Sequence, residues 1–210
     1  MTEFFVGLDL GQARDYTALA ILERSETLGD RDAVSWERRK VVACRVRHLE
    51  RVPLGTPYPD VVTRVAEVVA SLRRSGRCQL MVDATGVGPP VIDMLRRENL
   101  DCWLRPVKVT SGDSESEKDG YYRVPKRDLI VGLQVMLQSG KLKFATGLPW
   151  GDAFLKEITE MRVKVTGEGH EQFGAWREGT HDDLVFAVAL AGWGADRWVT
   201  QDMFGRRRLI

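Results

Sequence analysis

Aspartates interrupt or end three apolar runs of this chain, and their positions restrict how the chain can fold. Asp9 lies inside the run FVGLDLG, Asp83 ends the run LMVD, and Asp182 and Asp183 open the run DDLVFAVALA. An ionised side chain in a buried strand is costly unless it is paired or binds a metal. A fold that joins the ends of two strands to the start of one helix would gather all of these carboxylates.

Each acid also has a structural explanation. Asp182 and Asp183 stand where a helix would begin, and aspartate often caps free backbone amides there. Asp83 precedes the turn ATGVG, where it could form an Asx-turn. Asp9 is harder to explain in this way, because it lies between two leucines. The acids taken together favour one site over separate structural roles.

The order of predicted elements is typical of an α/β domain. Short apolar runs predict strands at 4–10, 17–23, 39–48, 79–83, 102–109 and 141–144. Apolar residues at helical spacing predict helices at 58–74, 91–98, 125–138, 152–161 and 182–193. We expect a central mixed sheet in which an antiparallel meander is followed by parallel strands, with the charged strand 39–48 at an edge.

Polar segments predict the irregular parts. Residues 24–37 should form a hairpin loop, 110–120 the least ordered stretch, and 163–177 a weak β-hairpin. We expect one domain over 1–198 and a mobile basic tail over 199–210.

Composition bounds the class of protein. The 210 residues are 43% apolar and 29% charged, with a net charge of +1, as in an ordinary globular protein whose neutral total could still hide a basic patch. Cys44, Cys78 and Cys102 are odd in number and form no CxxC, which favours inert reduced thiols. No signal peptide is visible, and the longest apolar run is far shorter than the roughly 20 residues of a membrane span. We therefore expect a cytoplasmic protein.

The acids indicate a particular chemistry. Carboxylate oxygens suit hard ions such as Mg²⁺ and Mn²⁺, whereas the chain has no Cys/His cluster for softer metals. Two such ions about 3.5–4 Å apart can activate a water and stabilise the leaving oxygen of a phosphodiester. Asp9 could bridge both ions and Asp83 could hold one, with Asp182 and Asp183 completing the set.

Four stretches together resemble the nuclease domain of viral large terminases, in the RNase H-like superfamily. They are VGLDLGQARDYTALAIL, VDATGVG followed by a helix, KRDLIVGLQVMLQSGKLKF and HDDLVFAVALA, and they span residues 6 to about 193. The resemblance implies an RNase H-like α/β fold with helices on both sides of the sheet. It also implies a DNA endonuclease that uses two divalent metal ions, Mg²⁺ or Mn²⁺.

The resemblance carries roles to particular residues. Asp9 matches the first-strand aspartate, Asp83 the acid that ends the fourth strand, and Asp183 the helix acid. Asp182 is an adjacent auxiliary or alternative ligand, and which of the pair faces the metal stays open. Asp15 in the first hairpin turn either assists the metal ligands without binding the metal itself or has a plain turn role.

The sequence departs from whole terminases in one respect. It has no GxxxxGK[ST] loop, because no Lys follows the glycines of DATGVGPP. The chain is either an excised nuclease domain or a free-standing relative. In the first case its partners would include the packaging ATPase domain, the small terminase and the portal, besides double-stranded DNA.

Basic residues near the polar loop are candidate phosphate contacts, although each could equally lie on a solvated face. They are Arg123, Lys126, Arg127 and Lys141, with Lys143 beside the last. Tyr121 and Tyr122 could stack on a base or pack the loop. His181 could assist proton transfer or only introduce the helix.

Two other functions are compatible with these motifs. A Holliday-junction resolvase or transposase core would share the fold and the acids. GLDLG followed by Thr17 also resembles the phosphate-contacting hairpin of actin-like and sugar-kinase ATPases, although the chain has room for only one lobe.

Overall fold

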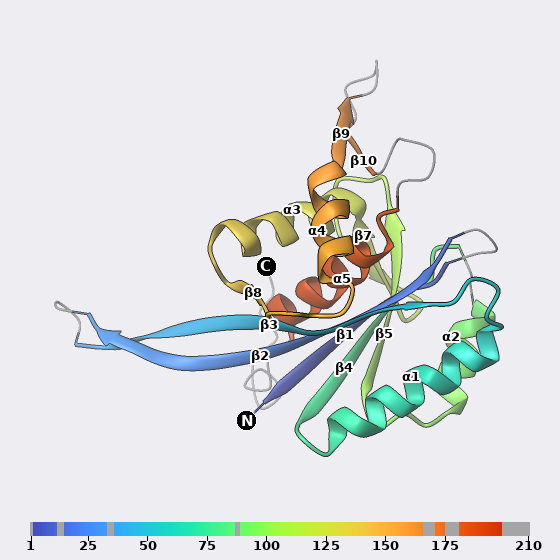
Figure 1. Cartoon of the computed structure of the whole chain (residues 1–210), viewed down its shortest axis with the longest axis horizontal. Helices are drawn as coiled ribbons and strands as arrows, with labels where there is room; N and C mark the ends of the chain where they lie inside the picture. The colour runs from blue at the N-terminus through green and yellow to red at the C-terminus, as the bar shows by residue number, and fades with distance from the viewer. Residues whose placement is uncertain are drawn as a thin grey trace.

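A computed structural model describes residues 2–11, 15–32, 36–86, 89–165, 171–174 and 181–198. In these residues the chain forms a mixed eight-stranded sheet with helices on both faces, and a separate two-stranded hairpin (Figure 1). The sheet strands are β1 (Glu3–Asp9), β2 (Thr17–Arg31), β3 (Arg38–Val52), β4 (Arg77–Asp83), β5 (Trp103–Thr110), β6 (Ser116–Lys118), β7 (Tyr121–Pro125) and β8 (Leu142–Phe144). The helices are α1 (Tyr58–Arg73), α2 (Pro89–Arg97), α3 (Lys126–Gln138), α4 (Gly151–Glu160) and α5 (Asp183–Arg197).

The strand order is β6-β7-β5-β4-β1-β2-β3-β8, which places β1 inside the sheet. β1 pairs antiparallel with β2, and β2 with β3, so the expected meander is confirmed. On its other side β1 pairs in parallel with β4, followed by parallel β5 and β7. β1 and β4 therefore end at the same edge of the sheet.

Helices cover the two faces unequally. α1 and α2 lie on one face, and α3, α4 and α5 lie on the other (Figure 1). α5 crosses β1 and β2 and is buried on nearly all sides, as expected of a helix that is apolar all round. Gly7 permits this close approach, because a Cβ there would collide with the carbonyl oxygen of Ala187. The packing fixes the first turn of α5 above the end of β1.

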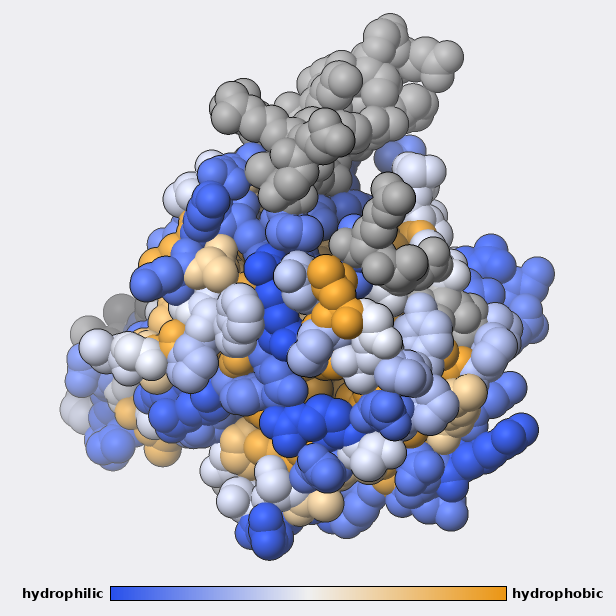
Figure 2. All heavy atoms as spheres, turned by 45° about the vertical axis from the view of Figure 1, so that its right-hand side comes forward, coloured by the Kyte–Doolittle hydropathy of each residue, from blue (hydrophilic) through white to orange (hydrophobic). Residues whose placement is uncertain are grey.

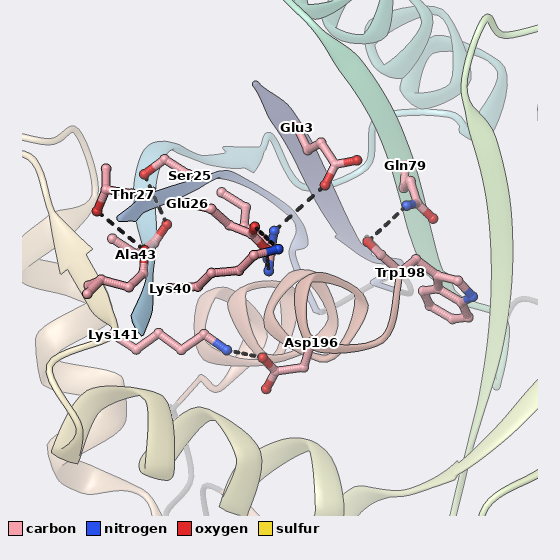
Figure 3. A network of polar contacts seen from close by, with 12 residues as sticks. Glu3, Ser25, Glu26, Thr27, Lys40, Ala43, Gln79, Lys141, Asp196 and Trp198 are labelled. Atoms are coloured by element: carbon pink, nitrogen blue, oxygen red, sulfur yellow. Dashed lines mark hydrogen bonds and ion pairs between the residues drawn. The ribbon is translucent and has the colours of Figure 1, made fainter. Parts of the chain in front are cut away.

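The expected loop over 24–37 is wrong over most of its length. β2 continues to Arg31 and β3 begins at Arg38, so the two strands form a ribbon that projects beyond the sheet (Figure 1). The ribbon buries little, and its strands therefore lack the apolar alternation from which strands are predicted. Its base is held by charges, since buried Arg24 pairs with Glu3 and Glu26 (Figure 3).

Of three further expectations, two have to be corrected and the third, a β-hairpin, agrees with the structure. β8 pairs in parallel with residues 44–46 of β3, so β3 is covered along part of the edge that we expected to be free. The stretch 110–120 contains β6, which pairs with the unpredicted strand β7. The hairpin expected around 163–177 is present as β9 (Arg162–Val165) paired with β10 (Glu171–Gly174).

Two other expectations concern the chain as a whole. The tail expected over 199–210 lies outside the described residues, and the domain assignment 1–198 stays a prediction. Among the described helices, none is long and apolar enough to cross a membrane.

Candidate active site

The fold brings the acids together at one edge of the sheet. Leu8 of β1 pairs with Val82 of β4. The next residue of each strand, Asp9 and Asp83, therefore lies at the end of its strand beside the other. The first turn of α5 lies over these ends and brings Asp182 and Asp183. All four line an open cleft of about 390 Å³. Its other lining residues are Leu10, Gly11, Asp15, Tyr16, Thr85, Gly86, Val109, Lys126, His181 and Phe186.

Asp9 is the most strongly perturbed acid of the cleft. Burial raises its pKa well above the ordinary value, and the carboxylates of Asp83, Asp182 and Asp183 raise it further. The ammonium group of Lys126 opposes this rise. A carboxyl group in this position accepts a negative charge readily only when more positive charge enters the cleft.

Asp83 forms the Asx-turn that its sequence allows and lines the cleft as well. Its Oδ1 accepts the Thr85 backbone N–H at 2.8 Å and the Thr85 hydroxyl. The Thr85 hydroxyl oxygen in turn accepts the Val109 N–H at 2.7 Å. Burial raises the Asp83 pKa, and the hydrogen bonds from Thr85 oppose the rise. The turn therefore fixes one carboxylate oxygen at the strand end.

Asp182 and Asp183 are held in different ways. Asp182 is the N-cap residue of α5, but its side chain makes no capping hydrogen bond. Its Oδ2 instead accepts from Lys126 Nζ at 3.2 Å. Asp183 is only 6% exposed, and both of its oxygens accept from Arg51, at 2.7 Å from Nε and 3.0 Å from Nη2. The capping interpretation of the pair is therefore not supported by the side chains.

Arg51 and Glu157 belong to the same network, and the sequence did not point to them. Glu157 of α4 is buried, accepts from Arg51 Nη2, and accepts the Val185 backbone N–H at 3.0 Å. A register shift in the β2–β3 ladder decides which face Arg51 occupies, and sequence alternation cannot reveal that shift. Glu157 offered a clearer signal, because it follows buried Phe154 by three positions on one helix face.

The predicted basic residues fall into three groups. Lys126 lines the cleft and pairs with Asp182, and its contact with DNA phosphates stays a prediction. Arg123 and Arg127 are exposed on β7 and at the start of α3, close in sequence to Lys126. Lys141 pairs with Asp196 near the far end of α5 (Figure 3), about 20 Å along the helix from the acids. Lys141 therefore lies away from the acids, and its contact with DNA phosphates stays a prediction.

Two polar residues predicted near the acids also line the cleft. His181 Nδ1 lies 3.9 Å from Asp183 Oδ1, and its ring meets that of Tyr16 edge to face at 5.3 Å. Asp15 is exposed at the cleft.

The tyrosines of β7 take different places, with Tyr121 buried and Tyr122 packed edge to face against Trp193. Tyr121 thus packs and does not offer its ring for stacking.

The donors in the cleft suit a hard divalent cation, because they are carboxylate oxygens. In the part of the chain that the structure describes, no group of three or more His, Cys, Asp or Glu side chains is close enough to hold a metal ion. The positive charges paired with these acids are those of Lys126, beside Asp182, and Arg51, beside Asp183.

On the face brought forward in Figure 2 the described side chains are mostly hydrophilic, with apolar ones in small separate groups. Such a surface suits a polar ligand.

Comparison with known proteins identifies the family. The model of the terminase RNaseH-like domain matches residues 60–192, more than half of the chain. The chain belongs to this family. No curated protein sequence matches it significantly.

Solved terminase nucleases share the fold. The large terminase nuclease from thermophilic phage G20c is 24% identical, with a TM-score of 0.61 over 90% of this chain and 81% of that chain. The nuclease domain of large terminase subunit gp2 of bacterial virus Sf6, with manganese and β-thujaplicinol, is 14% identical, with a TM-score of 0.59 over 91% and 87%. The human cytomegalovirus terminase nuclease domain is 13% identical, with a TM-score of 0.57 over 93% and 84%. These similarities confirm the RNase H-like fold of this terminase-family chain.

Proposed function

We propose that this chain is a metal-dependent DNA endonuclease that hydrolyses phosphodiester bonds, like the terminase nucleases that cut viral DNA during genome packaging. The observation that carries the proposal is the meeting of Asp9, Asp83, Asp182 and Asp183 in one cleft of a terminase-family fold. The G20c nuclease with bound magnesium and the Sf6 domain with manganese support a divalent cation as cofactor.

The acids of the cleft would hold two ions, Mg²⁺ or Mn²⁺. Asp9 would be the residue suited to contact both ions, because its carboxyl group is close enough for the charges of Asp83, Asp182 and Asp183 all to raise its pKa. Bound ions of this kind activate a water and stabilise the leaving oxygen of the phosphodiester. The protein's own part is to orient these carboxylates through Thr85, Lys126 and Arg51.

Substrate binding falls to charges beside the cleft. Arg123 and Arg127 are exposed next to Lys126 in the sequence, and we assign them contacts with DNA phosphates. Such contacts give affinity with little sequence preference and depend on salt. Double-stranded DNA is the substrate expected of the terminase-like function proposed above.

Within a packaging machine, the domain would work beside a packaging ATPase, a small terminase and a portal, in the cytoplasm of a host cell. The sequence has no GxxxxGK[ST] loop, so ATP hydrolysis has to come from another domain or protein. The family match weighs against an actin-like or sugar-kinase role. A junction resolvase shares the fold, and the choice of substrate separates the two.

The test is cleavage of supercoiled plasmid with Mg²⁺, Mn²⁺ or EDTA by the wild type and the Asp9→Asn variant. We expect nicking that requires the metal and disappears in Asp9→Asn. The variant should fold at least as stably as the wild type above pH 7, because it removes a carboxylate whose ionisation burial disfavours. Asp93→Asn, the same exchange at an exposed position of α2, is the matched control, and this variant should cut plasmid normally.

Two outcomes would contradict the assignment. Cleavage by Asp9→Asn at the wild-type rate would remove Asp9 from the metal site. Cleavage of a four-way junction in strong preference to plasmid and linear duplex would replace the terminase-like function by a resolvase function.

A further inference from the structure

Arg51 is a largely buried side chain next to the cleft, and it makes hydrogen bonds to two acids. Its side chain is 11% exposed and donates to both oxygens of Asp183 and to Glu157. Two parallel N–H···O contacts define the plane of a carboxylate, which a single contact does not. Asp183 is therefore fixed in orientation before any ligand enters.

Tyr16 and two residues of α4, its N-cap Trp150 and Glu157, contact the guanidinium itself. It lies 4.9 Å from the centre of the Tyr16 ring and 5.5 Å from that of the Trp150 ring. Trp150 has a left-handed φ of 64°, a conformation that costs a non-glycine residue energy and needs support from its surroundings. Glu157, the second carboxylate partner, is anchored to the α5 backbone at Val185. Residues far apart in the sequence thus converge on this one side chain.

Asp182 is held differently from its neighbour. Among the described residues, its side chain accepts one hydrogen bond, at 3.2 Å from the half-buried Lys126 ammonium group, which carries no planar fork. Asp182 is 32% exposed at its side chain, against 7% for Asp183. The acid pair therefore consists of one fixed and one adjustable carboxylate.

We propose that Arg51 is a positioning residue of the nuclease, which orients Asp183 for metal binding and leaves Asp182 free to adjust. The proposal rests on the metal-dependent function proposed above. Partners of metal ligands commonly set ligand orientation, and their loss typically lowers metal affinity or activity about 10–100-fold. Arg51 acts through Asp183 and touches neither substrate nor ion.

The chain contains a second arginine that makes a bidentate contact with a carboxylate, and this one lies outside the cleft. Arg64 of α1 donates to both oxygens of Glu50 at 2.9 Å, in the same bidentate geometry, but on the face of the sheet opposite α5. Arg→Lys keeps the charge and removes the fork at either position. Both substitutions remove a bidentate contact, and only one of them concerns the cleft. The Arg64 side chain is 43% exposed against 11% for Arg51, so Arg64→Lys should cost less stability and controls for the loss of the fork alone.

The experiment compares Arg51→Lys and Arg64→Lys with the wild type. Mg²⁺ and Mn²⁺ binding is measured by calorimetry without DNA, and plasmid cleavage is measured against metal concentration. We expect Arg51→Lys to weaken metal binding about tenfold or more and to shift half-maximal cleavage to a correspondingly higher metal concentration. The rate at saturating metal should change less. Arg64→Lys should match the wild type in both assays.

Metal binding by Arg51→Lys as tight as that by Arg64→Lys would overturn the proposal. Tighter binding would also overturn it, since Arg51 would then compete with the ion for Asp183. If Arg51→Lys does not fold, Glu157→Gln serves instead, because its amide oxygen can still accept the Val185 N–H. A few-fold loss of metal affinity is expected there, and no loss would count against the proposal. Wild-type protein that binds metal but cuts no DNA would refute the nuclease function and leave the role of Arg51 decided by calorimetry.

Discussion

Glu157 yields a quantitative prediction, because it is an acid buried under the cleft. It is 6% exposed, and burial raises its pKa from 4.5 to about 7. The Val185 N–H and Arg51 oppose the rise, whereas the charges of Asp183 and Asp182 add to it. Burial and the neighbouring acids thus outweigh the ion pair.

The sign follows from proton binding. The folded state holds the Glu157 proton more tightly than the unfolded state, so this residue's contribution is fully present below about pH 4.5 and is lost as pH rises through about 7. At about 1.4 kcal/mol per pH unit, the wild type should lose about 3 kcal/mol of unfolding free energy over this interval through Glu157. Glutamine cannot ionise and avoids that loss.

Urea unfolding of wild type and Glu157→Gln at pH 5, 6, 7 and 8 measures this effect. Subtracting the two free energies cancels the titration of groups that both proteins share. We expect the difference to move in favour of the variant by about 2–3 kcal/mol between pH 5 and 8. Glu160→Gln, at an exposed position of the same helix, should give a flat difference. A flat or opposite trend for Glu157→Gln would mean that Arg51 keeps Glu157 ionised, and would refute the reasoning.

Three further substitutions test the packing, the turn and the DNA contact. Gly7→Ala should cost about 1–3 kcal/mol or more in urea unfolding, because its Cβ collides with the Ala187 carbonyl oxygen, and cleavage should fall as α5 shifts. Thr85→Val should lower stability by about 0.5–1.5 kcal/mol and weaken metal binding, because Asp83 loses its hydroxyl donor at an exposed turn. Arg127→Ala should weaken DNA binding in a filter-binding assay without changing sequence preference, and reduce the salt slope by about one.

The acids were predictable because each marks a boundary that the sequence displays. Asp9 interrupts one apolar run and Asp83 ends another, and parallel pairing of β1 and β4 then places these two positions side by side. The long apolar run after Asp183 predicted a buried helix, and burial requires that helix to cross the sheet. Local pattern and fold class therefore sufficed to predict that Asp9, Asp83 and the α5 acid pair would line one cleft.

The second layer of the site depends on features that the sequence does not display. Arg51 faces the acids only because the β2–β3 ladder shifts register between Ile21 and Leu22. Without that shift, alternation would place residue 51 on the opposite face of the sheet. Lys126 was assigned to the DNA path because a lysine at the start of an amphipathic helix carries no sign of an acid partner as distant in the sequence as Asp182. Long-range partners of charged residues are set by packing, which a local pattern does not encode.

The two cations of the cleft differ in how firmly they are held, and this difference bears on how an ion could enter. Within the described residues, Lys126 donates one hydrogen bond to Asp182, lies 5.1 Å from the centre of the Phe186 ring, and has a partly exposed side chain. Arg51 has several contacts and little exposure. A divalent ion approaching Asp9 would repel both, but only the lysine has a flexible stem and open space into which to move. The contact between Lys126 and Asp182 is therefore the one that can yield, while the Arg51 contacts preserve the shape of the site.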